Sequence, residues 1–250
     1  MNEPADTIVI ASAIAELVGS STFIAYAPWP EGDSAQIADW LQLAAGVEKV
    51  GLDRARKLDD FGFCRGADQW ELARDAVLAV SVTELARFLF VWGGLETAIS
   101  AIEPPADPAR PGKINAACQL IRGTYGDSPL RGVTSLLASL EKDADQWGGD
   151  SVGARFGRLA EYGKSAIGLH VVYGLRNRLA HGSLRLPGPE QGEAVARTIQ
   201  ACSTLTLLSL QMLLSAALRR QETFDVWSLE FGECDVHFLL NNLHLLEDGA

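Results

Sequence analysis

The most constraining feature of this sequence is a run of 21 residues without a charged side chain, residues 198–218. Such a run is long enough to cross a bilayer as a helix. Eight of its residues are nevertheless Ser, Thr or Gln, whereas a helix that faces lipid is more uniformly apolar. We therefore expect a helix that other helices bury on all sides, with a membrane span as the alternative.

Composition supports a folded chain with a substantial core. Hydrophobic residues make up 48% of the 250 residues, which excludes a disordered chain and allows one or two domains. The net charge of −11 argues against non-specific binding to nucleic acid or membranes, unless basic residues gather locally. The four cysteines have no metal-binding spacing, and the N-terminus has no basic signal region. We expect a cytoplasmic protein with no metal and no cofactor.

Hydrophobic periodicity predicts an all-α helical bundle. Four prolines within residues 103–112 must end one long helix, and Gly93-Gly94 inside that helix indicates a close helix contact or a kink. The predicted helices cover residues 6–26, 34–57, 68–102, 113–147 (split near 126–129), 151–182, 198–221 and 236–246, with a short strand near 224–231. We divide the chain into an N-terminal helical extension (1–66), a helical bundle (67–221) and a C-terminal tail packed on the bundle (222–250).

One segment carries residues suited to chemistry, Leu-Arg-Asn-Arg-Leu-Ala-His-Gly at residues 175–182. The five steps from Arg176 to His181 turn an ideal helix by about 500°, which leaves the side chains about 140° apart and about 7.5 Å apart along the axis. The two residues therefore do not share a face. They can meet if the helix ends at Gly182, or if two copies pack about a two-fold axis.

Basic residues concentrate around this segment. Residues 155–185 contain six basic residues and one acid in a protein that is acidic overall. A local basic strip is the expected footprint of a docked phosphate backbone. The candidate RNA-binding residues are Arg158, Lys164, Arg178 and Arg185.

These residue types suit RNA cleavage. Histidine exchanges a proton near neutral pH, and arginine presents a permanent fork of donors to phosphate. RNA supplies its own nucleophile, the 2′-hydroxyl, so His181 and Arg176 suffice without a metal, and Asn177 can orient the reacting groups. In the structural alternative, Gly182 ends the helix, and His181 in the last turn only benefits from the helix dipole.

The sequence Arg-Asn-Arg-Leu-Ala-His-Gly at residues 176–182 resembles the Arg-x(4–6)-His motif of the HEPN superfamily. It looks most like the Apea-like HEPN proteins that are linked to phage defence. The aromatic-rich residues 86–94, followed by Leu95 and Glu96, are similar to the preceding helix of that group. The resemblance covers roughly residues 70–220.

This resemblance implies a homodimeric bundle with two Arg–His motifs in one cleft, and a metal-independent endoribonuclease that acts in toxin–antitoxin, abortive-infection or antiviral systems. Arg176 and His181 are then the catalytic pair, and Asn177 fills the polar position after the arginine. The implied products end in a 2′,3′-cyclic phosphate, and the implied partners are RNA, a second copy and an antitoxin or other defence protein, with no membrane. Some toxin members carry Tyr two positions after the histidine, where this chain has Ser183. The alternative is an inactive HEPN-like module that dimerises and regulates a partner protein.

Overall fold

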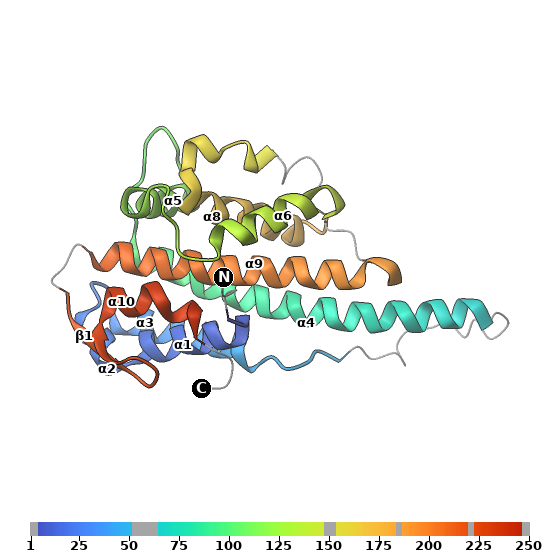
Figure 1. Ribbon diagram of the computed structural model, residues 1–250, viewed down its shortest axis with the longest axis horizontal. Coiled ribbons are helices and arrows are strands. Elements are labelled where there is room, and N and C mark those ends of the chain that lie inside the picture. Colours follow the sequence, from blue (N-terminus) through green and yellow to red (C-terminus); the bar gives the residue numbers. More distant parts are fainter. Residues whose placement is uncertain (1–4, 52–64, 148–153, 184–186, 220–222, 247–250) are drawn as a thin grey trace.

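Helices arranged in three layers make up the fold. The computed structural model describes residues 5–51, 65–147, 154–183, 187–219 and 223–246. Within them the chain is a helical bundle with one small two-stranded sheet, which confirms the predicted all-α class. Helices α4 and α9 lie side by side in the middle layer, α5, α6 and α8 cover one side, and α1, α3 and α10 cover the other (Figure 1).

The helices are α1 (Thr7–Gly19), α2 (Ser21–Tyr26), α3 (Glu31–Gly46), α4 (Arg65–Ile102), α5 (Lys113–Tyr125), α6 (Val133–Trp147), α8 (Leu159–Ala180), α9 (Gly192–Leu218) and α10 (Val236–Asn242). Two 3-10 helices, η2 (Pro189–Gln191) and η3 (Leu243–Leu245), precede α9 and follow α10. Strands β1 (Asp225–Ser228) and β2 (Gly232–Asp235) form an antiparallel hairpin. The helices predicted over 68–102, 113–147 and 151–182 correspond to α4, to α5 with α6, and to α8.

Helix α9 forms the centre of the core, as expected. In the most apolar stretch of 18 residues in α9, 94% of the residues are buried, so packing in the core accounts for the apolar composition of the helix. Several of its hydroxyls bond within the helix: Thr206 Oγ1 donates to the Cys202 carbonyl at 2.7 Å, and Ser209 Oγ donates to the Leu205 carbonyl at 2.8 Å. Helix α4 is also long and apolar enough to cross a membrane. In its most apolar stretch of 18 residues, 39% of the residues are buried.

One continuous hydrophobic cluster includes side chains from all three predicted divisions of the chain. Ile10 comes from the N-terminal part, Leu95 from the bundle and Leu239 from the tail. The division at residues 66 and 221 stays a prediction, and within the described residues all three parts contribute to this one core.

The prediction of one helix over residues 6–26 was wrong, because the helix breaks at Ser20. Asp6 caps the N-terminus of α1 as expected, since its carboxylate accepts from the Ile8 N–H at 2.8 Å. Ser20 is extended (φ −70°, ψ 145°), and its hydroxyl oxygen accepts from the Phe23 N–H at 3.2 Å. This side-chain cap starts α2 and compensates for the interrupted backbone ladder.

The helix predicted over residues 34–57 ends earlier, at Gly46. Residues 47–51 instead run alongside α4, whose side chains bond to some of their backbone groups. Arg87 Nε donates to the Val47 carbonyl at 2.8 Å, and the Val50 N–H donates to Thr83 Oγ1 at 3.0 Å. The rest of that prediction, residues 52–57, lies outside the described residues.

The predicted helix contact at Gly93-Gly94 is confirmed. A Cβ atom added at Gly93 would lie 2.8 Å from the Trp40 ring of α3, and one added at Gly94 would lie 3.2 Å from Leu41. Both glycines therefore let α3 and α4 approach closely. In the tail, the predicted strand is β1, and its partner β2 was not predicted.

Candidate functional site

Helix α8 carries the Arg–His motif and is bent near its start. Gly163 adopts a left-handed conformation (φ 68°) that interrupts the helix. After the bend, Asp127 Oδ1 accepts from the Lys164 N–H at 3.1 Å, and the Ser165 hydroxyl donates to the Gly126 carbonyl at 2.6 Å. These contacts hold the helix directly after the bend.

The C-terminal end of α8 forms a Schellman motif around Gly182. Gly182 has φ 63°, its N–H donates to the Leu179 carbonyl at 3.1 Å, and the Ser183 N–H donates to the Arg178 carbonyl at 2.9 Å. The predicted helix end at Gly182 is therefore confirmed. His181 is the exposed C-cap residue, and its N–H donates to the Asn177 carbonyl at 3.0 Å.

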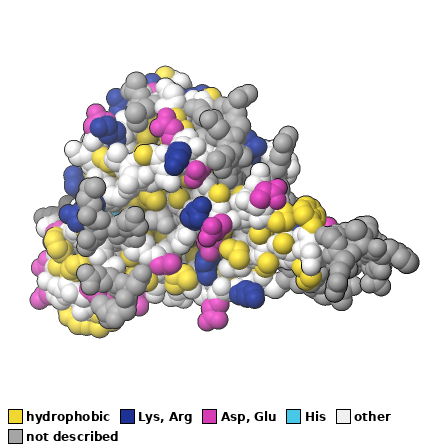
Figure 2. Space-filling model, turned by 45° about the vertical axis from the view of Figure 1, so that its right-hand side comes forward, with side chains coloured by type: hydrophobic (Ala, Val, Ile, Leu, Met, Phe, Trp, Pro, Cys, Tyr) yellow, Lys and Arg dark blue, Asp and Glu magenta, His cyan; other side chains and the backbone are white. Residues whose placement is uncertain are grey.

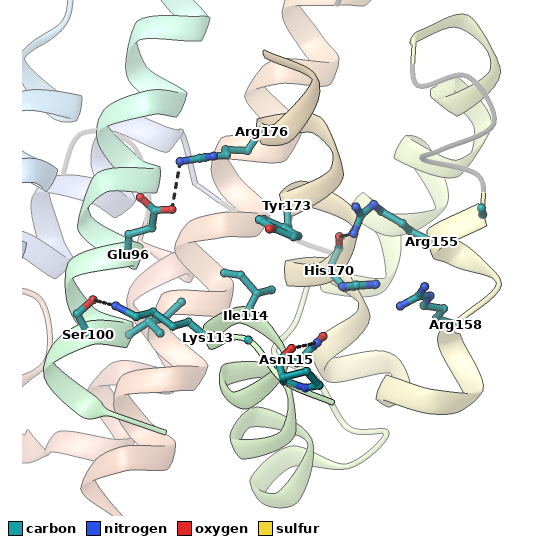
Figure 3. A pocket seen from close by; sticks show the side chains of 14 residues that line it. Glu96, Ser100, Lys113, Ile114, Asn115, Arg155, Arg158, His170, Tyr173 and Arg176 are labelled. Carbon is teal, nitrogen blue, oxygen red and sulfur yellow. Dashed lines mark hydrogen bonds and ion pairs between the residues drawn. The ribbon is translucent and has the colours of Figure 1, made fainter. Parts of the chain in front are cut away.

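A cavity of about 690 Å³ lies between the end of α4, the start of α5 and α8. Figure 3 shows charged and polar side chains from these elements, and from the segment before α8, converging on it. Its lining residues are Glu96, Ile99, Ser100, Pro111, Gly112, Lys113, Ile114, Asn115, Ala154, Arg155, Arg158, His170, Tyr173 and Arg176.

Arg176 lies at this cavity and is held by α4. Its Nη2 atom is 3.4 Å from Glu96 Oε1, and the Arg176 side chain is 34% exposed. His181 is not among the lining residues. Within one copy, the cavity therefore contains the arginine of the motif without its histidine.

Arg155 is fixed against the α8 backbone. Its Nη1 donates to the His170 carbonyl at 3.3 Å, and its guanidinium carbon lies 5.3 Å from the centre of the Tyr173 ring. Gly174 makes this approach feasible, because a Cβ atom there would lie 2.6 Å from Arg155 Cδ. Burial, together with the charge of Arg158, lowers the pKa of Arg155.

The predicted RNA-binding residues fall in different places. Arg158 lines the cavity together with Arg176, whereas Lys164 and Arg178 do not. Arg178 Nη2 donates to the Ser183 carbonyl at 3.2 Å, which reinforces the helix end. Arg185 lies outside the described residues.

His170 is a cavity residue that sequence reasoning missed. It is 5% exposed, its ring centre is 4.6 Å from that of Tyr162, and burial with the charges of Arg155 and Arg158 lowers its pKa to about 4. A signal was available, since His170, Tyr173 and Arg176 follow each other at intervals of three residues and neighbours at that spacing share a helix face.

The two histidines of the tail form hydrogen bonds with side chains of α9. His237 Nδ1 is 3.1 Å from Ser215 Oγ, and His244 Nδ1 is 3.1 Å from Gln211 Oε1. Across the described part of the chain, no group of three or more potential metal ligands is found.

Comparisons with protein-family models, with curated proteins and with solved structures gave no match to this chain.

Proposed function

We propose that this chain is a HEPN-type endoribonuclease that cleaves RNA without a metal ion at a site composed by two copies, and that it acts as a cytoplasmic toxin or phage-defence effector. The ion pair between Glu96 and Arg176 is the observation that carries the proposal. It connects the two segments on which the resemblance rests, residues 86–96 and 176–182. Segments separated by about 80 positions thus meet at the one arginine to which the motif assigns chemistry.

The geometry of α8 favours a site shared between two copies. Arg176 and His181 differ by about 140° around an ideal helix, so within one copy they point to different sides. His181 is exposed at the helix end, where a second copy can reach it. A two-fold axis near this end would bring the Arg176 of each copy to the His181 of the other.

In the proposed reaction, one imidazole takes the proton of the RNA 2′-hydroxyl. The 2′-oxygen forms a bond to phosphorus, the bond from phosphorus to the 5′-oxygen breaks, and the leaving oxygen takes a proton from the same imidazole, which is now charged. The guanidinium of Arg176 binds the non-bridging oxygens, and Asn177 orients the reacting groups. The products are a 2′,3′-cyclic phosphate and a 5′-hydroxyl.

The test is cleavage of labelled RNA in excess EDTA by the wild type, Arg176→Ala and His181→Ala. We expect cleavage by the wild type and a loss of about 100-fold or more in each variant, because acid–base groups and donors that stabilise the developing charge each contribute on this scale. Arg197→Ala is the matched control, since Arg197 forms an exposed pair with Glu193 on α9, 3.3 Å apart. Cleavage that requires a metal, or that persists in His181→Ala, would refute the proposal.

The alternative, a non-catalytic module that dimerises and regulates a partner, is favoured by one observation. Figure 2 shows hydrophobic side chains gathered on the surface near the end of the molecule where α4 begins. On α4, Trp70, Leu72 and Val80 are about half exposed, at 47%, 50% and 53%. A self-associating protein whose RNA-cleaving activity is absent would support this alternative.

A further inference from the structure

The cavity beside α8 holds more positive charge than its own carboxylate can neutralise. Lys113, Arg155, Arg158 and Arg176 line it, and the one lining carboxylate, Glu96, is engaged with Arg176. Among the described residues no ion pair is found for Lys113, Arg155 or Arg158. Because like charges that line one cavity repel each other, an anion in this cavity would be stabilised.

His170 gives an independent indication of a ligand. Its side chain is buried, it lines the cavity, and neither ring nitrogen has a hydrogen-bond partner within the described structure. Buried polar side chains are nearly always partnered, so an exception that faces a cavity points to a bound group. In Figure 3 the imidazole lies next to the side chains of Arg155 and Arg158.

The cationic groups are also preorganised. The carbonyl of His170 and the ring of Tyr173 hold Arg155, and Gly174 leaves the space that it occupies. On the facing wall, Lys113 Nζ donates to Ser100 Oγ at 3.1 Å. A site whose donors are already in place loses less side-chain entropy when it binds an anion.

We propose that this cavity binds the phosphate group of a phosphomonoester, with Arg155, Arg158 and His170 facing the phosphate oxygens. A phosphomonoester offers three terminal oxygens, which suits donors that arrive from several directions. The volume of about 690 Å³ leaves room for a nucleotide-sized molecule beyond the phosphate. The phosphate belongs either to a small molecule or to the end of an RNA strand, and the inference stands whether or not the chain cleaves RNA.

Calorimetric titration of the full-length His181→Ala protein with AMP and with adenosine tests this site separately from cleavage. We expect AMP to bind at least about tenfold more tightly than adenosine, because charge-assisted hydrogen bonds contribute on this scale. Arg158→Ala removes an exposed side chain, and Gly174→Ala displaces Arg155 from within. Each change is expected to weaken AMP binding by about tenfold, and Arg197→Ala is expected to leave it unchanged.

Two further measurements sharpen the result. The imidazole nitrogen signals of His170, assigned by their loss in His170→Gln, are expected to shift when AMP is added, which a purely structural histidine would not do. Tighter binding of a 5′-phosphorylated RNA trinucleotide than of AMP would identify an RNA end, and the reverse order would identify a small molecule. Equal binding of AMP and adenosine, or wild-type AMP affinity in both Arg158→Ala and Gly174→Ala, would overturn the proposal.

Discussion

Two buried histidines make the stability of this protein depend on pH. Burial lowers the pKa of His170 to about 4, with help from Arg155 and Arg158, and it lowers the pKa of His244 to about 4, with help from Arg131. The ordinary value is 6.5. Between these values the unfolded chain binds more protons than the folded one, so the stabilisation is complete above pH 6.5 and is lost as the pH falls towards 4.

We predict that acidification from pH 7 to 4.5 lowers the free energy of unfolding by roughly 2 kcal/mol for each of these two histidines. Urea titrations across this range measure the loss. His170→Gln should reduce the loss by about that amount, because glutamine does not titrate. The exposed His181→Gln is the matched control, and an unchanged pH dependence in His170→Gln would contradict the assignment.

At the scale of elements, the contact between α3 and α4 depends on the absence of a side chain at Gly93. We predict that Gly93→Ala destabilises the protein by about 1–3 kcal/mol, because its Cβ would meet the Trp40 ring at 2.8 Å. The melting temperature measures this loss. Gly123→Ala on α5 is the control, since a Cβ there meets nothing within 4 Å and alanine favours the helix. A melting temperature of Gly93→Ala equal to that of the wild type would show that α3 can shift without any loss of stability.

Local signals predicted most elements, and they failed where a side chain competes with the helix. The capping side chain of Asp6, the prolines after α4 and Gly182 all act within a few residues, so the sequence reveals their effect. The break at Ser20 was missed because serine, although it favours caps over helix interiors, interrupts a helical pattern less clearly than proline does. The end at Gly46 was missed, and the donation from Arg87 to the Val47 carbonyl that accompanies it spans 40 positions, so no local pattern reveals it.

The candidate site was predicted only in part, for the same reason. The motif identified Arg176 and His181, and the charge count identified Arg158. The cavity, however, is assembled from four separate stretches of chain, and only folding brings Lys113 and His170 to the same space. Charge and spacing along one helix therefore predicted the basic residues near α8, but not the residues of the other elements that line the cavity.

At the scale of the whole molecule, the proposed shared site allows two inactive variants to complement each other. We predict that Arg176→Ala and His181→Ala regain RNA cleavage when they are mixed and allowed to exchange copies. About a quarter of the sites then contain both groups, since half of the dimers are mixed and each mixed dimer has one complete site. Differently tagged copies report the mixed dimers, and mixed dimers without cleavage would place each site within a single copy.

Helix α9 has one more consequence for the molecule as a whole. Several of its hydroxyl groups bond to carbonyls of the same helix, and neighbouring helices from every part of the described chain contact it. Residues 202–218 of α9 are all buried, so water can reach their peptide groups only when those neighbours separate. These peptide groups are thus exposed only when the whole fold opens, and local opening of the outer elements leaves them protected from water.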